Sequence, residues 1–212
     1  QRVVLPALCL PNEQAKWLAV ADEAAQQSQR GAPVLIGTRS LEASERLSAV
    51  LTAAGLAHRV LNARQDAEEA DIIAEAGLSG KITVATNMAG RGTDIRLGPG
   101  VPEAGGLHVI LTEFHDSPRI DRQLIGRCAR QGDPGTAAAF VAIDDDLFVR
   151  NGGWLLDILR LAGQTQGSSR ALGLLRWIAQ RGTAKIQARE RRDTLAQDRS
   201  LDTMLAFAGN QI

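Results

Sequence analysis

Apolar positions repeat with two different periods along the chain, and the two kinds of segment alternate. Residues 13–29 predict a helix that starts after Asn12 as N-cap and ends before Gly31, with one apolar face formed by Trp17, Val20, Ala21 and Ala24. The next apolar run, Val34–Ile36, is short and unbroken, which indicates a buried strand.

The same alternation continues to about residue 150. Ser40 and Ser117 are predicted N-caps, and Pro118 suits the first position of a helix. Further helices are predicted at residues 41–54, 66–77 and 118–130. Further strands are predicted at residues 58–62, 81–86, 107–112 and 136–143. Short apolar strands that alternate with helices are typical of a parallel sheet with both faces covered, so we predict an α/β domain over residues 1–150.

The pattern changes after Asn151-Gly152-Gly153, where no strand signal remains. Three helices are predicted, at residues 154–161, 170–181 and 183–208, so residues 151–212 form a helical extension. Basic residues outnumber acidic ones between Arg176 and Arg199. This excess marks either a solvated helix face or a partner-binding face.

Composition narrows the class of protein. The 212 residues carry 24 basic and 24 acidic side chains, and the neutral balance argues against nucleic-acid binding through a broad basic surface. The longest apolar run, Ala137–Ile143, is far shorter than the roughly 18 residues that a membrane span needs. Pro6 and Pro11 interrupt the apolar start, so no secretory leader is expected. Gln1 in place of Met suggests a piece of a longer chain.

Metal chemistry has little support in the sequence. Cys9 and Cys128 lie far apart, which argues against a thiolate zinc site, and the three histidines show no ligand spacing. His115-Asp116 is a weak candidate for a metal-binding pair. The run Asp144-Asp145-Asp146 is better explained as the start of a helix than as a magnesium site.

A glycine-rich loop after the predicted strand 81–86 is the first candidate site. Gly90 and Gly92 allow a tight turn that brings backbone N–H groups to an anion, Thr93 follows, and Asp94 can accept hydrogen bonds from a ribose. Ile95 stands where a dinucleotide fingerprint needs glycine or alanine. By itself the segment is better explained as a glycine-rich loop that turns a corner.

A pair of arginines forms the second candidate. On the predicted helix 118–130, Gln123, Arg127 and Arg130 share one stripe, next to an apolar stripe formed by Ile120, Leu124 and Cys128. Guanidinium groups held by a packed helix suit a transferring phosphoryl group. Surface salt bridges are the alternative. No lysine completes a Gly-Lys-Ser/Thr phosphate loop, so the chain has candidate arginine fingers but no P-loop of its own.

Several longer stretches carry a family resemblance. They are 33–45 (PVLIGTRSLEASE), 60–63 (VLNA), 85–95 (ATNMAGRGTDI), 105–110 (GGLHVI) and much of 112–135, including its end RQGDPG. Together they resemble the second RecA-like motor domain of SecA, the ATPase that drives preproteins through the bacterial translocation channel. The resemblance implies a RecA-like sheet of the helicase C-terminal type and covers about residues 10–150. Residues 151–212 resemble a shortened helical scaffold.

In this family ATP and Mg²⁺ lie between two RecA-like domains, and the first domain holds the P-loop and the metal. The resemblance implies that Gly90, Gly92, Thr93 and Asp94 bind the nucleotide, with Asp94 at the ribose. Arg127 and Arg130 would be arginine fingers. Gln123 would place the γ-phosphate or couple it to domain closure.

The implied partners are the first RecA-like domain of the full-length chain, unfolded preprotein and a SecYEG-type membrane channel. The implied location is the cytoplasm, at the inner face of the bacterial plasma membrane. Where the family usually has Arg-Gly-Arg-Ser-Gly-Arg, residues 125–130 read IGRCAR, and Phe114 and Pro118 stand where arginine is usual. A divergent paralogue, a helicase-type motor on nucleic acid and a degenerate scaffold or regulator therefore remain as alternatives.

Overall fold

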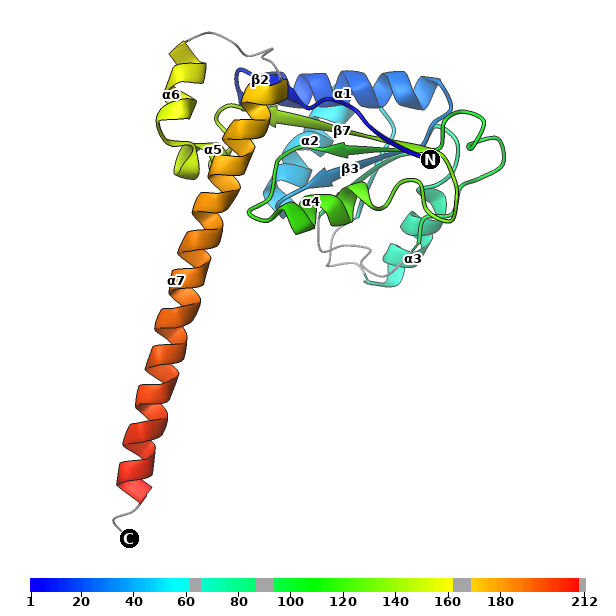
Figure 1. The fold of residues 1–212 in the computed structure, drawn as a ribbon. Helices are drawn as coiled ribbons and strands as arrows, with labels where there is room; N and C mark the ends of the chain where they lie inside the picture. The colour runs from blue at the N-terminus through cyan, green and yellow to red at the C-terminus, as the bar shows by residue number, and fades with distance from the viewer. Residues whose placement is uncertain (62–65, 87–93, 162–168, 210–212) are drawn as a thin grey trace.

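The computed structural model describes residues 1–61, 66–86, 94–161 and 169–209 and contains a fully parallel sheet in the order β1-β7-β6-β3-β5-β4, with β2 also on β7 (Figure 1). Its strands are β1 (Arg2–Val4), β2 (Leu8–Leu10), β3 (Val34–Thr38), β4 (Arg59–Leu61), β5 (Ile82–Thr86), β6 (Leu107–Leu111) and β7 (Gly135–Ala142). The central strands are wholly or almost wholly buried, which confirms the predicted α/β class.

Helices cover both faces of the sheet. They are α1 (Glu13–Gln29), α2 (Leu41–Ala53), α3 (Asp66–Glu75), α4 (Pro118–Ile125), α5 (Asp146–Asn151), α6 (Gly153–Leu161) and α7 (Ser169–Gly209). One core layer joins α1 and α2 to alternate strand residues such as Val34 and Ile36. The second layer, around Leu35 and Val109, joins α3, α4, α5, α6 and the first part of α7. The helical extension therefore packs on the same core as the sheet.

The predicted caps are present. The Asn12 side chain accepts from the Ala15 amide at 2.8 Å, and Ser40 accepts from the Ala43 amide at 3.1 Å. Ser117 caps α4 by accepting from the Arg119 amide. These local signals explain why the helix starts agree with the sequence-based prediction.

Two strands at the sheet edge were not predicted. β1 and β2 both pair with β7, at Arg2–Val4 against residues 135–137 and at Leu8–Leu10 against residues 140–142. Each has only three residues, and Pro6 lies between them, where an edge position tolerates a residue without an N–H. Their pairing depends on β7, so no local period reveals them.

The predicted helix over residues 118–130 is too long. α4 ends at Ile125 with Gly126 as C-cap, and the chain then enters the left-handed region at Ala129 (φ 54°) and Gln131 (φ 53°). Gln123, Arg127 and Arg130 therefore do not share one helical stripe. Gln123 lies on α4, whereas both arginines lie on the loop that follows it.

The two predicted helices at 170–181 and 183–208 are one helix. Gly182 lies inside α7, where a Cβ would come within 3.2 Å of Asn151 Oδ1, so glycine allows a close approach to α5. The Asn151 side-chain Nδ2 donates to Thr183 Oγ1 at 3.1 Å. The start of α7 packs through Leu172, Leu175 and Ala179, and the far end projects away from the sheet (Figure 1). Among the described residues, no helix is both long and apolar enough to span a membrane.

A histidine on β6 is buried beside polar side chains. His108 is 1% exposed, its Nδ1 lies 2.6 Å from Thr136 Oγ1, and its Nε2 lies 3.3 Å from Glu23 Oε1 without a hydrogen bond. Burial lowers the pKa of His108 from its usual 6.5, and the carboxylate of Glu23 opposes that change only in part.

We expect acid to destabilise this chain more than a His108→Asn variant. The folded-state pKa of His108 lies below 6.5, so folding favours the neutral imidazole. The stability that comes from this preference is fully present above pH 6.5 and is lost as the pH falls below that value. The loss is at most about 1.4 kcal/mol for each pH unit. Urea unfolding at pH 7.5 and 5.5 measures it, and equal pH slopes for the two proteins would contradict the assignment.

Candidate functional site

Asp94, at the end of the predicted glycine-rich segment, contacts the arginine loop, residues 126–132. Arg130 Nη1 donates to Asp94 Oδ1 at 3.1 Å, and Gln131 Nε2 donates to Asp94 Oδ2 at 2.8 Å. The two predicted site residues Asp94 and Arg130 are thus direct neighbours, although 36 positions separate them. Gly90, Gly92 and Thr93 lie outside the described residues.

This ion pair is accessible to solvent. The side chains of Arg130 and Asp94 are 40% and 33% exposed. A partly exposed pair contributes only about 0–1 kcal/mol, so a ligand with an anionic group and hydroxyl groups can replace it at little cost. The arrangement offers one cation and one hydrogen-bond acceptor side by side.

The backbone of the arginine loop is held from several sides. Arg2 donates to the Cys128 carbonyl from Nε and Nη2, at 3.3 and 3.0 Å, and Arg130 Nε donates to the Gly126 carbonyl at 3.0 Å. Cys128 is fully buried and packs in the core below the loop. Arg127 is half-buried, and its amide donates to the Leu124 carbonyl at 3.0 Å. Gln123 is exposed on α4.

Ala129 occupies a conformation that suits glycine, and the resembling family usually has glycine here. A left-handed φ of 54° costs an ordinary L-residue roughly 1–2 kcal/mol. We expect Ala129→Gly to raise the free energy of unfolding by up to about 1 kcal/mol, after allowance for the greater flexibility of glycine in the unfolded state. Urea unfolding measures this, with Ala54→Gly at the right-handed C-cap of α2 as a control that should be neutral or destabilising. A loss of stability in Ala129→Gly would contradict the reasoning.

A second polar region lies at the carboxyl ends of β3, β6 and β7. A cleft of about 540 Å³ is bordered there by the starts of α1 and α2 and by charged side chains, among them Lys16, Arg39, Arg46, Glu113 and Asp144. Most of the cations are already paired. Arg39 donates to both oxygens of Asp116, and Arg46 pairs with Glu13 and Glu42.

Lys16 and Asp145 form a buried ion pair beneath this cleft. Lys16 Nζ lies 2.5 Å from Asp145 Oδ1 and 4.0 Å from Glu113 Oε1. Burial raises the pKa of Asp145 to about 7, although Lys16 and the Ala142 amide both lower it. The run 144–146 does precede a helix, α5, as predicted, but the Asp145 side chain binds Lys16 and Ala142 instead of capping the helix.

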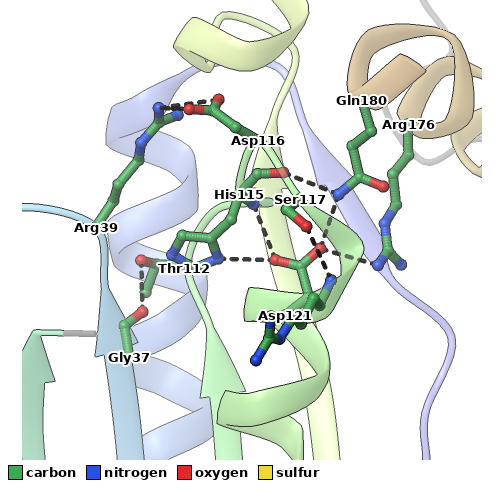
Figure 2. A network of polar contacts seen from close by, with 10 residues as sticks. Gly37, Arg39, Thr112, His115, Asp116, Ser117, Asp121, Arg176 and Gln180 are labelled. Atoms are coloured by element: carbon green, nitrogen blue, oxygen red, sulfur yellow. Dashed lines mark hydrogen bonds and ion pairs between the residues drawn. The ribbon is translucent and has the colours of Figure 1, made fainter. Parts of the chain in front are cut away.

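A polar network around Asp121 was not predicted (Figure 2). Asp121 is fully buried and accepts hydrogen bonds from His115, Arg176 and Gln180. His115 and Asp116 therefore take different partners and do not act as one pair. His115 and Asp121 lie in a recognisable motif, but no local pattern links them to α7, because Arg176 is 55 residues away from Asp121.

Comparison with known proteins supplies the family context. The model of the SecA P-loop domain family matches residues 2–102 and 98–163. Protein translocase subunit SecA 2 of Nitrosospira multiformis is 50% identical over 198 residues, which cover 92% of this chain and 29% of that protein. Protein translocase subunit SecA of Desulfotalea psychrophila is 54% identical over 136 residues, 64% of this chain and 16% of that protein. The chain thus spans less than a third of the length of these relatives.

Solved structures show the same fold at low sequence identity. The yeast DEAD-box splicing factor Prp28 aligns with a TM-score of 0.56 and 19% identity, over 84% of this chain and 37% of that chain. The E. coli DEAD-box protein SrmB aligns with a TM-score of 0.55 and 23% identity, over 69% of this chain and 79% of that chain. These likenesses establish a RecA-like, helicase-type fold.

Proposed function

The chain belongs to the SecA family, and from this premise we propose that it is the second RecA-like half of an ATP-driven motor that moves unfolded preprotein through a SecYEG-type membrane channel. We assign residues 1–150 to the motor domain and residues 151–212 to a shortened helical scaffold. The contact between Asp94 and Arg130 carries the proposal, because it brings one predicted nucleotide-binding residue against one predicted arginine finger.

The described residues fit a nucleotide between two motor domains. Asp94 presents a partly exposed carboxylate that can accept from ribose hydroxyls, and Arg130 presents a guanidinium suited to phosphate. Gly90, Gly92 and Thr93 would complete the loop around the nucleotide. We assign Arg127 as the second arginine finger and Gln123 to placing the phosphate or coupling it to domain closure.

Bound ATP with Mg²⁺ would supply the phosphoryl group whose charge these arginines stabilise. We place the metal and the P-loop on the first motor domain, since this sequence has no Gly-Lys-Ser/Thr. We also place the whole protein in the cytoplasm, peripheral at the inner face of the bacterial plasma membrane, with the first motor domain, preprotein and the channel as its partners.

ATP turnover separates the proposed function from its alternatives. We expect the full-length protein to hydrolyse ATP faster when unfolded preprotein and channel-containing vesicles are added, and the 212-residue chain alone to show no turnover. Stimulation by RNA with a steep loss of binding in salt would instead indicate a helicase-type motor. Stable partner binding by a full-length protein without turnover would indicate a scaffold. Turnover by the isolated chain would contradict the assignment of the P-loop to another domain.

A further inference from the structure

The Asp121 carboxylate is the meeting point of three segments. Its Oδ1 accepts from the His115 amide at 2.9 Å and lies 2.7 Å from His115 Nδ1. Its Oδ2 accepts from Arg176 Nη2 and from Gln180 Nε2, both at 2.9 Å. Figure 2 shows the α7 side chains converging on α4 from one side. Such a fully buried carboxylate is stable only while its donors remain in place.

α4 is too short to hold its own position. It has eight residues, and a helix of that length gains little stability from its own hydrogen bonds. Besides Asp121, it is anchored by Leu124, which packs directly over Gly37 of β3; a Cβ at Gly37 would overlap the Leu124 side chain. Because the arginine loop starts at the C-cap Gly126, the position of α4 sets where that loop begins.

α7 contributes more than hydrogen bonds to this anchor. The Arg176 guanidinium lies 4.3 Å from the centre of the Phe114 ring, and Phe114 packs edge-on against Phe148 at 6.2 Å. Gln180 also donates to the His115 carbonyl at 2.9 Å. Phe114 stands where the family usually has arginine, and an arginine there would repel Arg176.

We propose that Asp121 is a positioning residue through which α7 sets the place of the arginine loop, residues 126–132, so that movement of the helical extension changes how Arg127 and Arg130 meet a phosphate. The effect on a phosphate is the functional part of the proposal, and it rests on the proposed function. The placing of the loop by α7 is the mechanical part, and it rests only on contacts between α7, Asp121 and α4 in this chain.

Hydrogen exchange of the 212-residue chain tests the mechanical part. Four amides report on the loop, since those of Gly126, Arg127, Cys128 and Asp133 donate to nearby carbonyls. We expect Arg176→Met to accelerate their exchange roughly tenfold relative to amides of β6, because a hydrogen bond to a charged group is lost. The matched control is Arg189→Met on the same helix, whose side chain is 87% exposed. It should leave these rates unchanged.

Two results would overturn the proposal. One is faster exchange confined to α7 and residues near Phe114, with the loop unchanged. The other is equal acceleration of the loop and of β6, which would mean that Arg176 only stabilises the whole fold. Asp121→Asn provides a second variant. The oxygen of its side-chain amide can still accept from His115, but its NH2 group faces the donors of Arg176 and Gln180. Exchange in the arginine loop should therefore again become faster than exchange in β6.

Turnover by the full-length protein tests the functional part. We expect Arg176→Met to lower kcat roughly tenfold, with the KM for ATP unchanged, and Arg189→Met to behave as wild type. If loop exchange becomes faster but kcat is unchanged, α7 positions the loop but this positioning does not affect ATP hydrolysis, and only the functional part of the proposal is overturned. A wild-type full-length protein without ATP turnover would overturn the proposed function, while the exchange result would still decide whether α7 positions the loop.

Discussion

Replacing Arg130 with alanine in the full-length protein is expected to lower ATP turnover about 10³-fold or more, because a missing arginine finger removes the cation that stabilises the transferring phosphoryl group. The structure explains why this side chain is available. Its described partner, Asp94, forms only a partly exposed ion pair that is worth about 0–1 kcal/mol. A phosphate can therefore compete for the guanidinium at little cost.

The measurement must separate chemistry from folding and binding. Arg130 also donates to the Gly126 carbonyl, so its loss removes one contact within the loop. Steady-state turnover should be measured together with the Kd of a non-hydrolysable ATP analogue and with thermal unfolding. We expect kcat to fall severely while the unfolding temperature changes little.

Arg122→Ala is the matched control, since Arg122 is an exposed arginine on α4, eight residues before Arg130. It should turn over ATP at the wild-type rate. Arg130→Lys should recover only part of the activity, because an ammonium cannot form the two parallel hydrogen bonds of a guanidinium. A wild-type rate in Arg130→Ala would show that the arginine has no role in hydrolysis.

The sequence predicted the sheet because its central strands are short, apolar and bounded by caps. Val34–Ile36 and the run 107–112 are buried on both faces, so their composition alone marks them as interior strands. The N-caps Asn12, Ser40 and Ser117 act locally, within three residues, and for that reason the helix starts were also predictable.

The end of α4 was not predictable from the local pattern. Its apolar period continues through Cys128, which is buried, yet the backbone leaves the helix at Gly126. Contacts with distant residues hold the turn, among them the two hydrogen bonds from Arg2 to the Cys128 carbonyl. The sequence therefore identified Arg130 as a candidate but assigned it to the wrong local structure, and the network around Asp121 was missed for the same reason.

The loss of Lys16 should destabilise the fold more than any other change proposed for this chain. The side chain is 1% exposed, and its ammonium is the cation that faces the buried carboxylate of Asp145 at 2.5 Å. Breaking a buried pair by removing one partner typically costs about 3–5 kcal/mol, against a total stability of about 5–15 kcal/mol. We expect Lys16→Met to lose this amount in urea unfolding at pH 8, with exposed Lys185→Met as an unaffected control.

The pH dependence and a double variant identify the cause of that loss. Burial already raises the pKa of Asp145 to about 7, and removal of Lys16 deletes the main influence that lowers it. The pKa of Asp145 in the folded variant then lies further above the usual value of 3.8. The free energy of unfolding of the variant therefore falls as the pH rises from 3.8 to that raised pKa, and it recovers as the pH decreases. The stability deficit of Lys16→Met should therefore be smaller at pH 5 than at pH 8.

Lys16→Met combined with Asp145→Asn should recover much of the stability at both pH values, because Asn can still accept from the Ala142 amide. If the double variant is as unstable as Lys16→Met, the loss comes from the packing of the Lys16 stem against its neighbours and not from the stranded carboxylate.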